Sequence, residues 1–335
     1  MEISSRIAIT MGDPAGIGPE IIVKAFQDTA LNRICRPVVV GDARHLQTTA
    51  QRFTPDLEVR ALSSLSEASY EARCMNVIDL GNVPPDIALG QSSEAGGKAS
   101  VEFIRKAASL ALENQVDAMT TAPINKESMH RAGFIYPGHT EFLAELTGAK
   151  EVALMLAGKN LRVVLVTTHL PLKEVHQSIN ESAILSTVRL THNWCRQYVT
   201  DSPQIAVTGL NPHASDGGIF GREEKEIIAP ALAKAQSEGI SACGPLSADS
   251  LFAHGRFHKY DAVVTMYHDQ GMIPVKMDSQ GSAVNITLGL PILRTSVDHG
   301  TAYDIAGTGQ ADPASLQRAI AMAARLAAKP ALATQ

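Results

Sequence analysis

Residues 6–20 read Arg-Ile-Ala-Ile-Thr-Met-Gly-Asp-Pro-Ala-Gly-Ile-Gly-Pro-Glu, and this stretch decides the fold. Its first five residues form a short apolar run rich in β-branched side chains, which predicts a buried strand. A glycine-rich turn follows, and Pro19 stands where a first helical turn opens. We therefore predict a strand, a turn and a helix, with Asp13 as the turn residue best suited to a role beyond structure.

The turn matches neither common nucleotide-binding signature. A GxGxxG pattern that begins at Gly16 would need a third glycine where the chain has Ile21, and the Gly-Lys-Ser/Thr of a P-loop is absent. Its spacing alone favours a structural turn.

Similar units recur along the rest of the chain. Apolar runs typical of buried strands alternate with longer stretches of helical spacing, which predicts an α/β fold with βαβ units and a mainly parallel sheet. The expected strands are 6–10, 37–40, 116–120, 161–167, 204–207 and 262–265, and the expected helices are 97–113, 181–198, 223–238 and 313–328.

Size and composition limit the class of protein. A chain of 335 residues exceeds the size at which one core usually stops growing, so we expect two domains with a cleft between them. A net charge of −5 excludes a general attraction to nucleic acid or anionic lipid. Four scattered cysteines without a CxxC pair, no long apolar run and no signal peptide predict a cytoplasmic protein without a membrane span.

Polar residues that follow strands are the candidates for function, because α/β proteins bind ligands beyond the carboxyl ends of their strands. Five polar clusters stand at such places, and three of them contain a histidine: His169, His213 and His268. Three imidazoles can converge on one divalent ion and leave positions open for a substrate hydroxyl and carboxylate. Taken singly, each histidine is more typical of a structural residue, and only their shared placement favours a metal site. The clusters are residues 12–13, 123–126, 168–169, 211–213 and 267–270.

Candidate anion-binding residues gather late in the chain. Lys276, Asn285 and Arg294 occur at regular intervals, and His139 with Thr140 opens an amphipathic stretch whose helical N-terminus would add N–H donors. Arginine offers a bidentate fork and lysine a point charge. Because Lys276 and Arg294 have apolar neighbours in the sequence, neither is typical of an exposed face. Residues 298–307 combine a small-residue turn with polar side chains, which suits a close approach to a ligand as well as an ordinary loop.

Seven motifs, in order and nearly end to end, closely resemble the 4-hydroxythreonine-4-phosphate dehydrogenase family of vitamin B6 biosynthesis. The resemblance implies that His169, His213 and His268 bind a divalent metal (zinc, magnesium or cobalt), with one ligand lent across a homodimer interface. It also implies a substrate site made of His139, Thr140, Lys276, Asn285 and Arg294. The motifs are residues 11–20, 137–141, 167–172, 209–214, 266–271, 284–291 and 294–302.

The stretch from His299 to Gly307 is also similar to the cofactor element of isopropylmalate and isocitrate dehydrogenases. This similarity implies their two-domain fold with an interdomain active-site cleft. It also implies that His299, Gly300, Thr301, Ala302 and Asp304 contact NAD, with NADP as the alternative. Residues 1–130 with 295–335 would form one domain that carries both termini, and residues 131–294 a second that carries the metal ligands and the dimer contacts.

The implied reaction is a metal-dependent, NAD-linked oxidation of 4-phosphooxy-L-threonine at C3, followed by decarboxylation to 3-amino-2-oxopropyl phosphate. The proton acceptor stays open among Lys126, Asp249 and Lys276. Residues 11–13 and Tyr136 also occur in a branch that resembles 4-phospho-D-threonate and D-erythronate 4-phosphate dehydrogenases of sugar-acid catabolism, so these substrates are the alternative. A more remote one is a sensor that binds metal and a phosphorylated acid without turnover.

Overall fold

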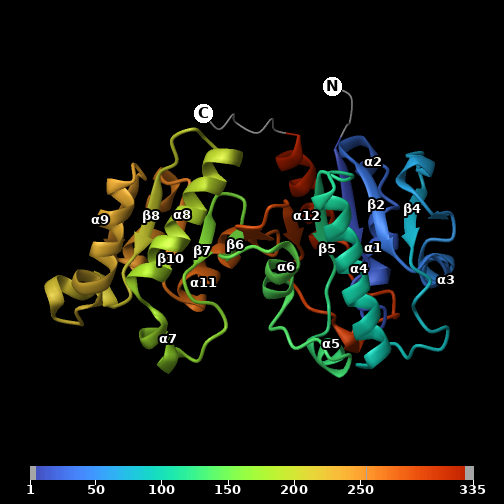
Figure 1. Cartoon of the computed structure of the whole chain (residues 1–335), viewed down its shortest axis with the longest axis horizontal. Coiled ribbons are helices and arrows are strands. Elements are labelled where there is room, and N and C mark those ends of the chain that lie inside the picture. The colour runs from blue at the N-terminus through green and yellow to red at the C-terminus, as the bar shows by residue number, and fades with distance from the viewer. Residues whose placement is uncertain (1–4, 254, 329–335) are drawn as a thin grey trace. The chain divides into compact units, whose positions relative to one another are not determined.

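The computed structural model describes residues 5–253 and 255–328. Contacts between the described residues divide the chain into two compact units (Figure 1): residues 5–149 together with 290–328, and residues 150–289. The sequence placed residues 131–149 and 290–294 in the second domain, whereas their contacts lie in the first unit. His139, Thr140 and Arg294 therefore belong to one unit.

The first unit contains six parallel strands in the order β3-β4-β2-β1-β5-β12. β12 comes from the end of the chain and pairs with β5, so segments far apart in sequence lie side by side (Figure 1). The strands are β1 (Arg6–Thr10), β2 (Arg36–Gly41), β3 (Glu58–Leu62), β4 (Cys74–Asp79), β5 (Ala118–Thr121) and β12 (Arg294–Ser296).

Helices cover these strands and complete the core of the first unit. One long helix, α4, packs on β1, β2 and β5, and its Phe103 and Ile104 are fully buried. The last helix, α12, packs on β5, β12 and α1. Side-chain caps start several helices; Ser93, for example, accepts a hydrogen bond from Gly96 N at the start of α4. The helices are α1 (Gly18–Ala25), α2 (Leu31–Ile34), α3 (Ala43–Phe53), α4 (Glu94–Leu112), α5 (Lys126–Arg131), α6 (His139–Thr147) and α12 (Ala314–Ala327).

The second unit contains strands in the order β11-β6-β7-β10-β8-β9. β6 runs antiparallel to both of its neighbours, and the pairs from β7 to β9 are parallel. The mainly parallel α/β fold is thus confirmed, while the antiparallel strands are an addition to the prediction. The strands are β6 (Ala153–Ala157), β7 (Arg162–Leu165), β8 (Ile205–Thr208), β9 (Ala242–Leu246), β10 (Ala262–Thr265) and β11 (Val284–Leu288).

The helices of the second unit pack on the same strands. α8 contacts β7, β8 and β10, and α11 places Met272 and Val275 in the core beside Val163 and Val263. The helix expected at 223–238 is divided, because a π-helical turn at Glu224–Ile228 precedes α9. The helices are α7 (Leu172–Ser178), α8 (Glu181–Tyr198), α9 (Ala229–Ser237), α10 (Ala248–Ala253) and α11 (His268–Ser279).

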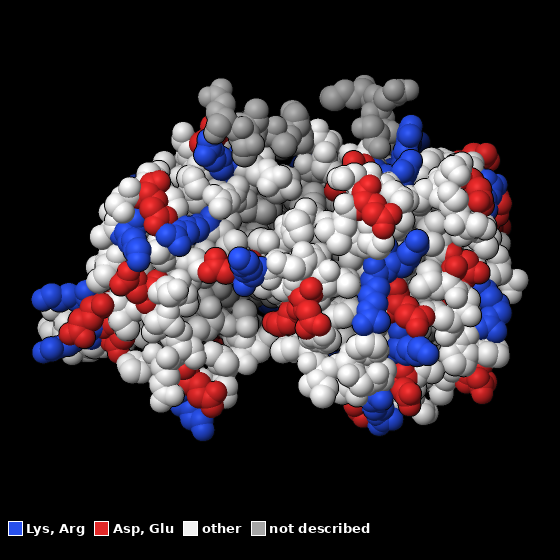
Figure 2. Space-filling model, in the orientation of Figure 1, with Lys and Arg blue, Asp and Glu red and all other residues white. Residues whose placement is uncertain are grey.

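The distribution of surface charge and the state of the cysteines agree with what the amino-acid composition predicts. Acidic and basic side chains are mixed over the face shown in Figure 2, as the small net charge of −5 predicts. All four cysteines are free thiols. In the part of the chain that the structure describes, no helix combines the length and the apolarity needed to cross a bilayer.

Candidate active site

Two of the three candidate metal-binding histidines lie side by side in the second unit. His169 follows β7, and His268 opens α11 directly after β10. Because β7 and β10 are parallel neighbours, their carboxyl ends bring the two imidazoles together, with ring centroids 5.7 Å apart. His268 Nδ1 lies 2.7 Å from Asp269 Oδ1. Such a carboxylate orients a ligating imidazole and leaves the other ring nitrogen for a metal.

The third histidine, His213, follows β8 in a left-handed turn. Its φ is +54°, and the next three residues also have positive φ, a conformation that costs non-glycine residues about 1–3 kcal/mol each. Buried Glu224 braces the start of the turn by accepting hydrogen bonds from Leu210 N at 2.8 Å and Asn211 N at 2.7 Å. His213 Nδ1 lies 3.7 Å from Asp249 Oδ2.

The histidines do not form a complete metal site within one chain. Across residues 5–253 and 255–328, no three side chains of His, Cys, Asp or Glu are arranged to hold an ion. A single chain presents the His169–His268 pair and, as a second group, His213 with Asp249. The donor chemistry fits a divalent ion, because imidazoles backed by carboxylates are typical zinc ligands.

Arg294 forms the centre of a cationic site in the first unit. It is the first residue of β12, its side chain is only 2% exposed, and its guanidinium donates to Thr121 Oγ1 from Nε at 3.1 Å and Nη2 at 2.6 Å. Burial lowers the pKa of Arg294 to about 9, although the nearby Glu141 carboxylate opposes this shift. A buried guanidinium is suited to an anionic ligand, because charge-assisted hydrogen bonds between a guanidinium and an anion are strong.

His139 adds a neutral group to the cationic site. It is the first residue of α6, and its buried Nε2 has no hydrogen-bond partner within the described residues. Burial, followed by the charge of Arg294, lowers the pKa of His139 well below its usual value, so the imidazole is neutral near pH 7. Together with Thr140, these groups can hold the oxygens of a phosphate or carboxylate.

The two remaining substrate candidates lie in the second unit. Asn285, on β11, has a buried Oδ1 without a hydrogen-bond partner among the described residues, as expected of a group that awaits a ligand. Lys276 is exposed, which corrects the inference from its apolar neighbours. The position on α11 explains this: Met277 lies opposite the buried face that holds Met272 and Val275, and Lys276 lies at the edge of that face, where its side chain reaches solvent.

The expected cofactor segment, His299 to Gly307, connects β12 with α12 and is tied to the turn after β1. Ile17 N donates to Thr301 O at 3.0 Å, and the Tyr303 hydroxyl donates to Asp13 Oδ2 at 2.8 Å. Asp13 is fully buried, and burial raises the pKa of its carboxyl. Ala302 and Asp304 belong to the same tied stretch, while His299 and Gly300 are exposed and accessible to a ligand.

The candidate proton acceptors differ in their surroundings. Lys126 is the exposed first residue of α5, where Asn125 caps the helix. Asp249 accepts hydrogen bonds from the Ser247 hydroxyl and from Ser250 N at 2.7 Å, and these bonds lower the pKa of its carboxyl. A lowered pKa makes Asp249 the weaker base.

Sequence analysis assigned no individual role to three residues in this arrangement. Thr121 holds Arg294, Glu224 braces the His213 turn, and Tyr303 anchors the segment before α12. Each acts on a residue at least 13 positions away in the chain. For Thr121, the one sequence signal is its place at the end of a strand, just before the polar cluster 123–126.

These features define the class: an α/β protein of the metabolic-enzyme type, whose strand ends present paired imidazoles and a buried guanidinium suited to a small anion. The family described as pyridoxal phosphate biosynthetic protein PdxA matches residues 33–323. The chain belongs to this family, as the seven motifs predicted.

Individual relatives match over nearly the full chain. The 4-hydroxythreonine-4-phosphate dehydrogenase of Trichlorobacter lovleyi is 50% identical, over 96% of this chain and 98% of that protein. The D-threonate 4-phosphate dehydrogenase of Cupriavidus necator is 43% identical, over 97% and 98%. A crystal structure of 4-hydroxythreonine-4-phosphate dehydrogenase from Klebsiella pneumoniae has a TM-score of 0.92 at 42% identity, over 98% of this chain and 100% of that one.

Proposed function

We propose that the protein is a metal-dependent, NAD-linked dehydrogenase that oxidises 4-phosphooxy-L-threonine at C3 and then releases carbon dioxide, yielding 3-amino-2-oxopropyl phosphate. The observation that carries the proposal is the buried Arg294 beside a neutral His139, a site suited to a phosphorylated acid. The 50% identity to a 4-hydroxythreonine-4-phosphate dehydrogenase supports the substrate.

The substrate carries a phosphate and a carboxylate, and the chain offers matching groups. Arg294 supplies a guanidinium and Lys276 a point charge. His139 and Thr140 supply neutral hydrogen bonds at the start of α6, and the free oxygen of Asn285 can accept one from a substrate hydroxyl or amine. Holding both ends of the substrate fixes its C3, which supplies orientation.

His169, His213 and His268 are the residues proposed to hold a divalent ion (zinc, magnesium or cobalt), completed by a ligand from a second copy of the chain. When bound, such an ion supplies Lewis acidity to the alcohol and to the carbonyl that replaces it. The carboxylate of Asp269 orients His268, and Glu224 holds the turn that carries His213.

NAD, or NADP as the alternative, is the proposed hydride acceptor. His299, Gly300, Thr301, Ala302 and Asp304 are the proposed contact residues. Lys126, Asp249 and Lys276 are the candidate acceptors of the alcohol proton: the lowered pKa of the Asp249 carboxyl makes it a weak base, and either lysine would act only in its deprotonated form. We also propose a cytoplasmic location, which suits four free thiols.

The direct test is a substrate panel with purified protein and NAD. We expect NADH formation with 4-phosphooxy-L-threonine and its loss after treatment with a chelator, restored by zinc, magnesium or cobalt. Activity that survives complete metal removal would exclude the metal-dependent mechanism. No NADH from any phosphorylated hydroxy acid would favour a sensor.

The second candidate substrate is 4-phospho-D-threonate, with D-erythronate 4-phosphate beside it. It is favoured by the 43% identity over nearly the whole chain to a D-threonate 4-phosphate dehydrogenase. The same panel separates the two, because the substrate with the higher kcat/KM is the one that the site has been shaped to bind.

A further inference from the structure

Four neighbouring strands of the second unit are followed by the candidate metal ligands and their carboxylate, in the sheet order β7-β10-β8-β9. His169 follows β7, His268 follows β10 and His213 follows β8, while Asp249 follows β9. The strand pairing ends before all four residues, so contacts beyond the sheet hold one loop against the next.

The main chain of Met266, the buried residue directly after β10, joins the end of β10 to the end of β7. Its carbonyl accepts hydrogen bonds from Thr167 N at 3.2 Å and from the Thr167 hydroxyl at 2.7 Å. Thr167 stands two residues before His169, and Met266 stands two residues before His268. These two bonds therefore fix the approach to one histidine against the approach to the other.

The side-chain amide of Gln270, on α11, joins the end of β10 to the end of β8. Its Oε1 accepts hydrogen bonds from Met266 N at 2.8 Å and from the buried Thr208 hydroxyl at 2.8 Å, and its Nε2 donates to Gly209 O at 2.7 Å. The amide thus takes the place of a main-chain peptide group between two strand ends whose own pairing has already ended. Two donors face its oxygen and a carbonyl faces its nitrogen, which fixes the orientation of the amide.

Gly209 continues the connection to β9. Its N–H donates to the carbonyl of Leu246, the last residue of β9, at 2.8 Å, and Asp249 follows three residues later. The four strand ends are therefore joined by one line of hydrogen bonds that follows the order of the sheet. Between β10 and β8 this line passes through the side chain of Gln270, so a substitution there can break it without changing the sheet.

We propose that Gln270 is a positioning residue that sets the spacing between the loop of His268 and the loop of His213, and that Thr167 does the same for His169. The proposal rests on the proposed function, because it concerns the ion that these histidines would bind. The spacing matters equally when a second copy of the chain completes the site, because each chain then presents its histidines as one set. Loss of a residue that orients ligands without touching the metal changes metal affinity by about 10- to 100-fold.

The test is a titration of the full-length, metal-free protein with Co²⁺, followed by calorimetry and by the visible absorption of the bound ion, which depends on its coordination geometry. We expect Gln270→Met, which keeps the length of the side chain and adds no charge, to weaken Co²⁺ binding by about tenfold or more and to change the spectrum. Thr167→Val removes only the hydroxyl bond to Met266 and should have a smaller effect in the same direction.

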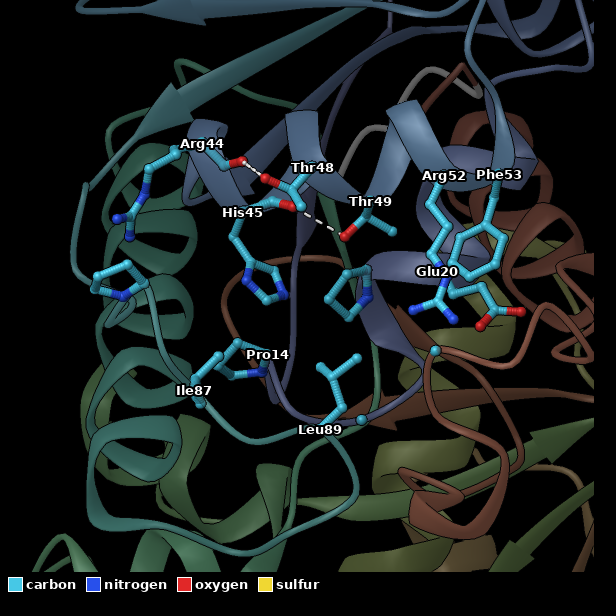
Figure 3. Close-up of a pocket in the computed structure, with 14 residues that line it drawn as sticks. Pro14, Glu20, Arg44, His45, Thr48, Thr49, Arg52, Phe53, Ile87 and Leu89 are labelled. Carbon is cyan, nitrogen blue, oxygen red and sulfur yellow. Dashed lines mark hydrogen bonds between the residues drawn. The ribbon is translucent and has the colours of Figure 1, made fainter.

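Two controls remove the same kinds of bond elsewhere. Gln236→Met removes an amide that donates to Ala242 O at 2.7 Å, at the amino end of β9. Thr49→Val removes a hydroxyl that donates to His45 O at 2.9 Å within α3 of the first unit (Figure 3). Neither bond belongs to the line of hydrogen bonds that joins the four strand ends, so both variants should keep the wild-type Kd and spectrum.

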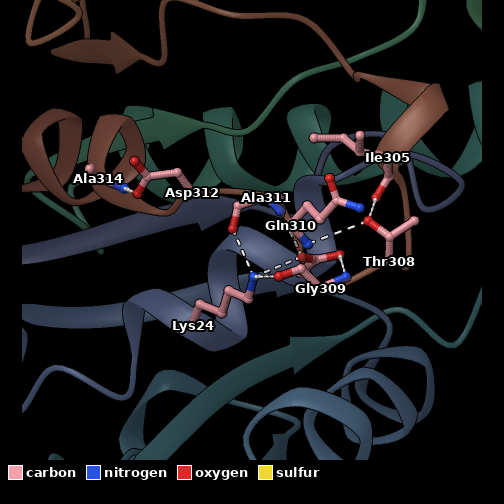
Figure 4. A network of polar contacts seen from close by, with 9 residues as sticks. Lys24, Ile305, Thr308, Gly309, Gln310, Ala311, Asp312 and Ala314 are labelled. Carbon is pink, nitrogen blue, oxygen red and sulfur yellow. Dashed lines mark hydrogen bonds and ion pairs between the residues drawn. The ribbon is translucent and has the colours of Figure 1, made fainter.

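A third control separates positioning from general stability. Lys24→Met breaks a network in the first unit, where Lys24 Nζ donates to the carbonyls of Gly309 at 2.7 Å and Ala311 at 2.8 Å and pairs with the buried Glu20 at 2.8 Å (Figure 4). We expect this variant to lower Tm and to bind Co²⁺ as the wild type does.

Several outcomes would overturn the proposal. The first is a folded Gln270→Met protein with the wild-type Kd and spectrum; if that variant does not fold, an unchanged Kd and spectrum in Thr167→Val has the same meaning. Equal weakening by Lys24→Met would show that the effect follows stability and not position. A wild-type protein that binds no Co²⁺ would overturn the proposed metal-dependent function and this proposal with it, whereas unchanged binding in the variants overturns only the positioning role.

Discussion

Arg294 shows how burial gives one side chain its role. Its side chain is 2% exposed, donates two hydrogen bonds to the Thr121 hydroxyl and lies near the Glu141 carboxylate. The same burial keeps His139 neutral, so the site has one positive charge and one neutral donor or acceptor. This combination discriminates in favour of an anion.

Arg294→Gln should therefore weaken binding of the phosphorylated substrate by about 10- to 100-fold, because a charge-assisted pair of hydrogen bonds is lost. Calorimetric Kd values and kcat/KM measure the effect. Arg33→Gln, on an exposed position of α2, should leave both values at the wild-type level. Unchanged affinity in Arg294→Gln would remove this residue from the substrate site.

His139 predicts a pH dependence of stability. Its pKa is lowered in the folded state, so below the ordinary value of 6.5 the unfolded chain takes up a proton that the folded chain does not. The free energy of unfolding should fall as pH falls through this range, by at most about 1.4 kcal/mol per pH unit from this residue. Urea unfolding between pH 7.5 and 5.5 should show a smaller fall in His139→Gln than in the wild type. The exposed His130→Gln should behave like the wild type, and an identical slope in His139→Gln would contradict the prediction.

At the scale of elements, the turn after β8 depends on a distant carboxylate. Four consecutive non-glycine residues from His213 have positive φ. Gly209 leaves no room for a side chain, because an added Cβ would lie 2.9 Å from Ala214 Cα and 3.0 Å from Glu224 Oε1. Glu224, in the π-helical turn, satisfies the two N–H groups at its base. The π-helical turn thus places the carboxylate that holds a candidate metal ligand.

Glu224→Gln should lower the free energy of unfolding by about 1–3 kcal/mol, because its amide nitrogen would face the donors of Asn211. Zinc affinity, measured by titration with a chelating indicator, should fall as well if His213 is a ligand. Glu226→Gln, an exposed carboxylate of the same turn, is the control and should change stability by less than about 0.5 kcal/mol. Equal stability in both variants would show that the hydrogen bonds of Glu224 to the His213 turn contribute little to folding.

At the scale of the whole molecule, large apolar side chains remain exposed on the second unit. Leu172, Ile219 and Met277 are 72%, 75% and 73% exposed. We predict that they contribute to an interface with another chain, because contiguous exposed apolar patches mark such interfaces. The metal site proposed above for His169, His213 and His268, with a ligand from a second copy of the chain, would also require such an interface.

We therefore expect a homodimer in sedimentation velocity and a shift toward monomer in Met277→Glu, together with a loss of zinc binding. The negative charge of the introduced glutamate would have to be buried in the dimer interface, and burying an unpaired charge is costly. Gln51→Glu, which adds the same charge at an exposed polar position of the first unit, should remain dimeric. A wild-type monomer that binds zinc would refute the shared site.

Local patterns in the sequence predicted much of this molecule. All six expected strands are present, and each of the five polar clusters follows a strand. Periodicity and turn residues act over a few positions, so the residues themselves carry this information. Local patterns in the sequence also indicated the helix that starts at His139 and the family motifs.

The amino-acid order by itself determined the alternation of strands and helices, the placement of the three histidines at strand ends and the family. Only the tertiary structure decided that Arg294 is buried against Thr121, 173 positions away, that Lys276 faces outward, and that Glu224 holds the His213 turn. The physical reason is that burial, pKa and hydrogen-bond partners depend on which distant segments pack together, and no local spacing records that choice.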